Sequence, residues 1–165
     1  MRTGGHTSDQ HGFTLVEVMV ALLIFSVSLL GLAALQASAL RDSHVADQNT
    51  IATQLARDMA ERLRANRPGV SSNLYDGISG PATTVPSCYG TSNSCTPAEI
   101  AQLDSGEWLA AVARALPSGT GTVQNNGAGF TITVMWDQER SGATGTSCSG
   151  DPSVDLKCLT FTVQP

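Results

Sequence analysis

The chain has 165 residues and a mass of 17.1 kDa, which is the length of one ordinary domain and too short for two full cores. Charged residues make up only 14% of it, against roughly 25% in a usual soluble domain, so part of the chain is expected to lie outside water. The formal net charge of −5 argues against a general nucleic-acid binder, which normally carries a basic patch.

A polar stretch of residues 1–12 precedes a long apolar one. Residues 15–35 are nearly all apolar, and Glu17 is their only charge. A helix of this length covers about 30 Å, the thickness of a bilayer's hydrocarbon core. The run is too long for a secretory signal peptide, so we expect residues 13–39 to form an apolar helix that lies in a membrane or in a bundle of similar helices.

Glu17 is the residue that a simple membrane anchor would not need. A carboxylate inside a membrane segment is expensive and usually has a partner or a role. Alternatively, Glu17 lies close enough to the interface to reach water. The residue pattern alone leaves both interpretations open.

Residues 40–67 are expected to continue the same helix as an amphipathic half. Its apolar residues recur every four positions: Ile51, Leu55, Met59 and Leu63. The Arg67-Pro68 pair predicts the end of the helix, because proline disfavours helical geometry in the residue before it. The apolar stripe should pack against a globular domain formed by residues 68–165.

The globular domain is predicted to be α+β. Residues 96–99 have the sequence of a capping box with proline at the first helical position, and they predict a helix that ends near Pro117 and can restart at residues 104–107. Residues 130–136 and 159–163 alternate between apolar and polar side chains, which predicts two strands of an antiparallel sheet. A turn is the better interpretation of the lone Gly-x-Gly at residues 119–121.

Residues 12–17, Gly-Phe-Thr-Leu-Val-Glu, followed by an apolar helix, resemble the class III signal of type IV prepilins and type II secretion pseudopilins. The resemblance implies that residues 1–12 are a leader peptide, removed by prepilin peptidase between Gly12 and Phe13, and that Phe13 is then N-methylated. It also implies an assembly charge pair between Glu17 and the free amine of Phe13 on a neighbouring subunit. The leader departs from the family in having Arg2 as its only sure cation.

Residues 52–66 resemble the helix end of the PilV family of minor pilins, the type IV pilus modification proteins. That family tends to show a cysteine pair, a short helix with tryptophan, a Leu-Pro-Gly-like turn and a strand ending in tryptophan. The corresponding positions here are Cys88 and Cys95, Trp108, residues 116–119 and residues 130–136. The resemblance implies a type IV pilin-like fold, in which the long N-terminal helix packs on a small C-terminal antiparallel sheet.

The four cysteines do not form a C-x-x-C motif, and no histidine follows His44, so a zinc site is not indicated. Export by the prepilin route would place the cysteines in the periplasm, where disulfides persist. Pairing by proximity gives Cys88–Cys95 and Cys148–Cys158, which is one of three possible connectivities.

Catalytic signals are nearly absent, since the sequence has no nucleophile elbow, zinc-protease helix or P-loop. We therefore expect neither enzymatic activity nor a cofactor or metal. Asp58 and Glu61 are interleaved with the arginines between residues 57 and 67, which favours a salt-bridged helix face over a nucleic-acid site.

The leading hypothesis is a minor pilin that assembles into or primes a type IV pilus. Its expected partners are prepilin peptidase, other minor pilins, the major pilin and the inner membrane, with a pilus-tip adhesin as a further candidate. The globular domain would lie in the periplasm before assembly and on the pilus afterwards. The alternatives are a type II secretion pseudopilin and a membrane-anchored periplasmic binding domain that never polymerises and keeps residues 1–12.

Overall fold

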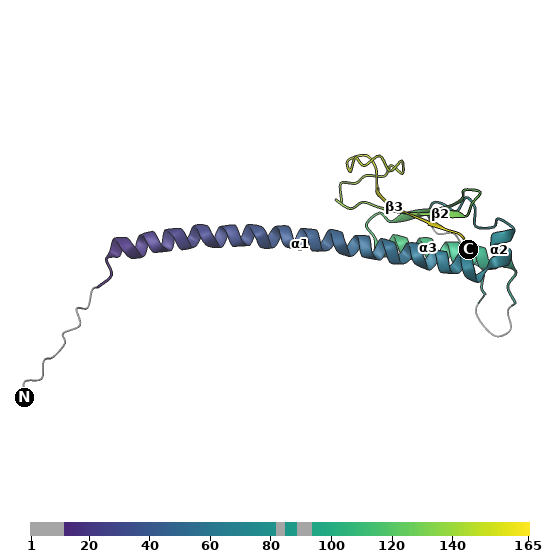
Figure 1. Ribbon diagram of the computed structural model, residues 1–165, viewed down its shortest axis with the longest axis horizontal. Coiled ribbons are helices and arrows are strands. Elements are labelled where there is room, and N and C mark those ends of the chain that lie inside the picture. The colour runs from purple at the N-terminus through teal and green to yellow at the C-terminus, as the bar shows by residue number, and fades with distance from the viewer. Residues whose placement is uncertain (1–11, 82–84, 89–93) are drawn as a thin grey trace, which may run out of the picture. The chain divides into compact units, whose positions relative to one another are not determined.

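A computed structural model describes residues 12–81, 85–88 and 94–165 (Figure 1). The chain divides into two compact units, Met1–Ser43 and His44–Pro165. The long helix α1, Leu15–Ala65, contributes residues to both units, which confirms the predicted N-terminal helix. In the first unit, residues 15–43 are exposed along their whole length, and this part of α1 is long and apolar enough to cross a membrane.

The apolar part of α1 is helical without interruption through Gly31. Two serines in it bond back to the preceding turn, because the hydroxyls of Ser26 and Ser28 donate to the main-chain oxygens of Leu22 and Ile24, 2.7 and 2.9 Å away. These bonds satisfy the hydroxyl donors within the helix itself, which removes the cost of placing them in an apolar environment.

The second unit combines the rest of α1 with two further helices and a sheet. The helices are α2, Arg67–Ser71, and α3, Pro97–Ala115. The strands are β1, Thr120–Asn125, β2, Phe130–Trp136, and β3, Lys157–Val163. They form an antiparallel sheet in the order β1-β2-β3, which Figure 1 shows stacked on α3 and the C-terminal part of α1. The predicted α+β fold is confirmed.

The two predicted strands, β2 and β3, pair with each other. Ile132 lies opposite Phe161 and Val134 opposite Leu159, so the large apolar residues of both strands share one face of the sheet. Strand β1 was not predicted, and the interpretation of residues 119–121 as a turn was wrong, because Thr120 already begins this strand.

Helix α3 confirms the predicted capping box. The Thr96 hydroxyl accepts from the Glu99 amide at 3.3 Å, and the Thr96 amide donates to the Glu99 carboxylate at 2.8 Å. The helix does not restart at residues 104–107 but runs on without a break. Asp104 does not act as a second cap there, because its carboxylate accepts hydrogen bonds from Arg62 and Tyr75.

The core lies between α1, α3 and the sheet. The residues of α1 that are fully buried in it are Ala52, Ala56, Met59, Ala60 and Leu63. Ile51 and Leu55 are only partly buried, so the buried stripe is rotated toward the alanines relative to the prediction. The Trp108 indole Nε1 on α3 donates to the main-chain oxygen of Leu55 on α1 at 2.9 Å.

Both predicted disulfides are present. Cys88 is bonded to Cys95 and Cys148 to Cys158, with Cα–Cα distances of 5.7 and 5.6 Å. Neither bond links separate elements of the core; each closes a short stretch of chain. The second bond attaches the loop of residues 137–156 to strand β3.

Candidate functional site

The first candidate site is the start of α1. The Thr14 hydroxyl accepts from the Glu17 amide at 3.3 Å, and the Val18 amide donates to the Thr14 main-chain oxygen at 3.3 Å. Thr14 therefore caps the helix, and Thr-x-x-Glu is the sequence of a capping box, a local signal from which this cap could have been predicted. Glu17 stands in the first turn, where a negative charge interacts favourably with the helix N-terminus.

Phe13 and Glu17, the two residues predicted to take part in assembly, line the same shallow apolar hollow at this end of α1. The other lining residues are Val18, Ala21, Leu22 and Phe25. Phe13 is 81% exposed, and among the described residues no cation forms an ion pair with Glu17. The site thus presents a carboxylate beside an exposed ring, on a helix with apolar side chains all around.

The predicted cleavage junction also lies at this end. Gly12 and Phe13 precede the helix and are both exposed, so the peptide bond between them is open to a peptidase. The proposed leader, residues 1–12, lies outside the described residues except for Gly12.

Exposed apolar side chains continue from this site along α1 as far as Leu40. Soluble monomers rarely expose contiguous apolar patches of this extent, and such patches mark contacts with a membrane or with other proteins. This surface, residues 15–40, is named the apolar segment below.

The arginines near the end of α1 form a second candidate site. Arg62 bonds to three carboxylates, those of Asp58 at 3.0 Å, Asp104 at 3.1 Å and Glu107 at 3.0 Å, and Arg64 pairs with Glu61. Partial burial lowers the pKa of Arg62, but the bonds to Glu107, Asp58 and Asp104 outweigh it and raise the pKa above its ordinary value. Arg62 therefore links α1 to α3, and its guanidinium is not available to bind phosphate. These ion pairs agree with the salt-bridged helix face predicted from the sequence.

Asp104 extends this cluster into the core. Its second carboxylate oxygen accepts from the Tyr75 hydroxyl at 2.6 Å, and the Asn66 amide nitrogen donates to the Tyr75 oxygen at 3.0 Å and to the Pro97 main-chain oxygen at 2.8 Å. Burial and the bond to Asp104 raise the pKa of Tyr75, so this hydroxyl stays protonated. The network stabilises the junction of α1, α2 and α3, and it presents no activated nucleophile.

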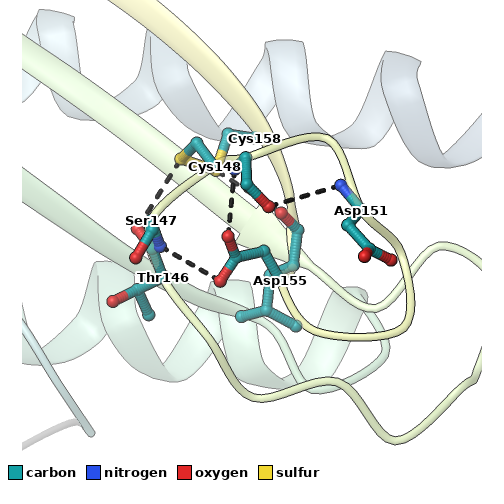
Figure 2. The surroundings of a disulfide bond; sticks show 8 residues. Thr146, Ser147, Cys148, Asp151, Asp155 and Cys158 are labelled. Carbon is teal, nitrogen blue, oxygen red and sulfur yellow. Dashed lines mark hydrogen bonds between the residues drawn. A yellow bond between two sulfur atoms is a disulfide. The ribbon is translucent and has the colours of Figure 1, made fainter.

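The third candidate is the loop of residues 137–156, which sequence reasoning left without an assignment. The Asp155 carboxylate lies beside the Cys148–Cys158 disulfide and accepts from the amides of Ser147 at 3.4 Å and Ser149 at 3.0 Å (Figure 2). Hydrogen bonds from the side chain and then the amide of Ser149, with a smaller contribution from the Ser147 amide, lower the pKa of Asp155. The buried carboxylate thus organises the backbone around it.

A second aspartate holds the other end of this loop. The Asp137 carboxylate accepts from the amides of Ser141 at 3.0 Å and Gly142 at 2.8 Å. Aspartate spaced a few residues before serine and glycine is a turn signal that could have marked this end of the loop. Within the described parts of the chain, no group of three or more histidines, cysteines and acids is placed to hold a metal ion.

Two families match consecutive parts of the sequence. Residues 7–33 match the prokaryotic N-terminal methylation motif, and residues 34–106 match the family described as type IV pilin Tt1218. No curated protein and no solved structure gives a significant match. The long helix packed on a small antiparallel sheet is the fold of the type IV pilin domain family, and the two matches support a type IV pilin with an N-terminal methylation motif. This family consists of structural subunits, and its motif fits membrane anchoring and pilus assembly.

Proposed function

We propose that the chain is a minor pilin, cut by prepilin peptidase between Gly12 and Phe13 and built as a structural subunit into a type IV pilus. The observation that carries the proposal is the position of Phe13 and Glu17 together at the exposed start of the apolar segment. Within the type IV pilins, the resemblance of residues 52–66 to PilV favours a minor pilin over a type II secretion pseudopilin.

The chemistry of this end explains why processing and assembly are coupled. Cleavage creates a free amine on Phe13, which is N-methylated and keeps a positive charge. Inside a bundle of apolar helices, a lone carboxylate costs several kcal/mol unless it is protonated or paired. Glu17 of one subunit forms an ion pair with the Phe13 amine of its neighbour. Only processed subunits in the correct register therefore avoid this cost.

The apolar segment moves from one apolar environment to another during assembly and is shielded from water in both. Before assembly the segment lies in the inner membrane, and the second unit lies in the periplasm, where its two disulfides persist. Afterwards the segment packs against the helices of other minor pilins and of the major pilin. A pilus-tip adhesin is a further partner that this placement allows.

Three matched variants of the helix start test the charge pair. Glu17→Gln removes the charge but keeps a side chain that suits a capping box, whereas Thr14→Ala removes the cap and keeps the charge. We expect Glu17→Gln and Glu17→Ala to be cut and methylated normally but to be poorly recovered in sheared pili. Thr14→Ala should be recovered much better than either.

A fourth variant separates processing from assembly. A bulky residue in Gly12→Leu should block cleavage and leave the full-length chain in the membrane. The charge pair would be excluded if Glu17→Gln were recovered in sheared pili at the wild-type level. A wild-type protein that keeps residues 1–12 would instead support a membrane-anchored domain that never polymerises.

A further inference from the structure

A groove of about 310 Å³ in the second unit lies between the beginning of its α1 portion and the end of α3. Its apolar lining includes Ile51, Leu116 and Pro117, and its polar lining includes Gln48, Arg114 and Arg140. We name it the α1–α3 groove. It is separate from the start of α1, which belongs to the other unit.

Gln48 supplies a fixed hydrogen-bond donor to the groove. Gln48 is only 8% exposed, and its Oε1 accepts a hydrogen bond from the indole Nε1 of the fully buried Trp136 at 3.2 Å. Indole nitrogen is a donor only, so the amide oxygen of Gln48 must face it and the NH₂ group must point elsewhere. Among the described residues that NH₂ group has no hydrogen-bond partner, and Gln48 lines the groove.

Positive charge gathers at the same place. Residues 68–165 contain eight acids and only three bases, and two of these bases, Arg114 and Arg140, line the groove from different elements. Neither guanidinium pairs with a carboxylate in the part of the chain that the structure describes. Asp47 is the one acid among the lining residues, and His44 adds a further polar group. The groove is therefore rich in donors within an otherwise acidic domain.

We infer that the α1–α3 groove binds an acidic segment of a neighbouring subunit in the fibre. Arg114, Arg140 and the Gln48 amide would hold its carboxylate, since guanidinium groups match carboxylates in a planar, two-bond geometry. Ile51 and Pro117 would contact an apolar side chain next to that carboxylate. The inference rests on the proposed function, because it requires neighbours in a fibre.

Two observations favour a neighbouring subunit as the occupant. The groove begins at His44, four positions after Leu40, which is the last exposed large apolar residue of the apolar segment. The groove residues therefore follow, in the sequence, the segment that the proposed function places against neighbouring subunits. The second observation is charge complementarity, because residues 68–165 carry eight acids against three bases and a neighbouring copy therefore offers carboxylates to the groove. A groove that receives a different surface of the next subunit makes a head-to-tail contact, the kind that builds open helical filaments.

Cross-linking in assembled fibres identifies the occupant. A benzophenone side chain placed at Ala115, an exposed lining residue, is activated in sheared pili, and the attached peptide is sequenced by mass spectrometry. The expected product joins Ala115 to a pilin segment that carries aspartate or glutamate outside the apolar helix. A cross-link to phospholipid, a cross-link to a segment without a carboxylate, or no cross-link would overturn the inference.

Charge reversal measures the contribution of the arginines. The double variant Arg114→Glu/Arg140→Glu should be recovered in sheared pili about tenfold less than the wild type, the effect of losing hydrogen bonds to an ionised carboxylate. Lys157→Glu reverses the third base of residues 68–165, which lies outside the groove, and should have no effect. Thermal unfolding and disulfide content of the full chain in detergent confirm that each variant is folded.

A compensating change completes the test. Reversing the carboxylate found in the cross-link should restore recovery of the double variant. Wild-type recovery of the double variant, or failure of the compensating change, would exclude the groove while leaving the proposed function intact. The proposed function itself fails if the wild-type chain is not methylated at Phe13 or does not enter the fibre.

Discussion

Trp108 on α3 lies against Gly121 on β1 so closely that a Cβ atom at Gly121 would overlap the indole ring. The same indole donates its Nε1 hydrogen to the main-chain oxygen of Leu55 on α1 at 2.9 Å. One fully buried side chain therefore joins both helices to the sheet. The helix packing of the second unit depends on a glycine near the start of strand β1.

Gly121→Ala should destabilise the protein by about 1–3 kcal/mol, because the added methyl group forces the indole or the strand to move. The measurement is the thermal unfolding of the full chain in detergent, followed by circular dichroism. Gly31→Ala is the matched control, since no atom outside its own helix backbone lies within 4 Å of a Cβ built at Gly31. An equal melting temperature for Gly121→Ala and the wild type would show that Trp108 yields without cost.

Met59→Ala and Leu55→Ala test which face of α1 is buried. Met59 is fully buried in the core and Leu55 only partly, although both belong to the stripe expected from the sequence. Met59→Ala should cost about 2–5 kcal/mol of the free energy of unfolding, and Leu55→Ala clearly less. Denaturant unfolding of the two variants gives the comparison. Equal losses would mean that the face of the helix is wrongly assigned.

The fold was predictable wherever local pattern carries it. Three local patterns each predict their element from neighbouring residues. They are the apolar run of α1, the capping box of Thr96 and Glu99, and the alternation of β2 and β3. Strand β1 is different, because residues 120–125 are polar except for Val123 and contain Gly121. Glycine is needed at this position because the Trp108 indole leaves no room for a Cβ atom. Trp108 belongs to another element, so no local pattern can show this contact.

The candidate sites divide in the same way. Gly12, Phe13 and Glu17 form a continuous motif, so the sequence could name them. Asp58 lies one helical turn from Arg62 and was visible as its partner, but Asp104 and Glu107 are far along the chain. Asp155 was missed because its partners are backbone amides, which every residue type except proline offers.

Asp155 should make the loop of residues 137–156 sensitive to acid. Hydrogen bonds lower the pKa of its carboxyl in the folded protein, so folding favours the ionised form. The resulting stability is fully present above the unfolded-state pKa of about 4 and is lost as the pH falls through the lower, folded-state pKa. Amide hydrogen exchange at Ser149, corrected for intrinsic rates, should accelerate in that acid range.

Two variants control this measurement. Asp155→Asn should show fast exchange at Ser149 already at neutral pH, with little further change in acid. Glu139→Gln changes an exposed carboxyl of the same loop and should behave like the wild type. Slow exchange at Ser149 in Asp155→Asn would show that the disulfide alone holds the loop.

The apolar segment should be weakest between Ser26 and Gly31 once it is packed in a fibre. No proline lies between Phe13 and Arg67, glycine costs about 1 kcal/mol relative to alanine in a helix, and the serines bond back to the preceding turn. Any loss of helix in the assembled subunit is therefore expected there, and Gly31→Ala should reduce it. A density map of the fibre with unbroken helix through Gly31 in the wild-type subunit would contradict this.

Mass spectrometry of the N-terminal peptide, taken from pili sheared off the cells that make this protein, tests the central claim most directly. A subunit of a type IV pilus should begin at Phe13, carry one methyl group on its amine and lack residues 1–12. A chain that is absent from the sheared fibres and still begins before Gly12 in the membrane would contradict the account.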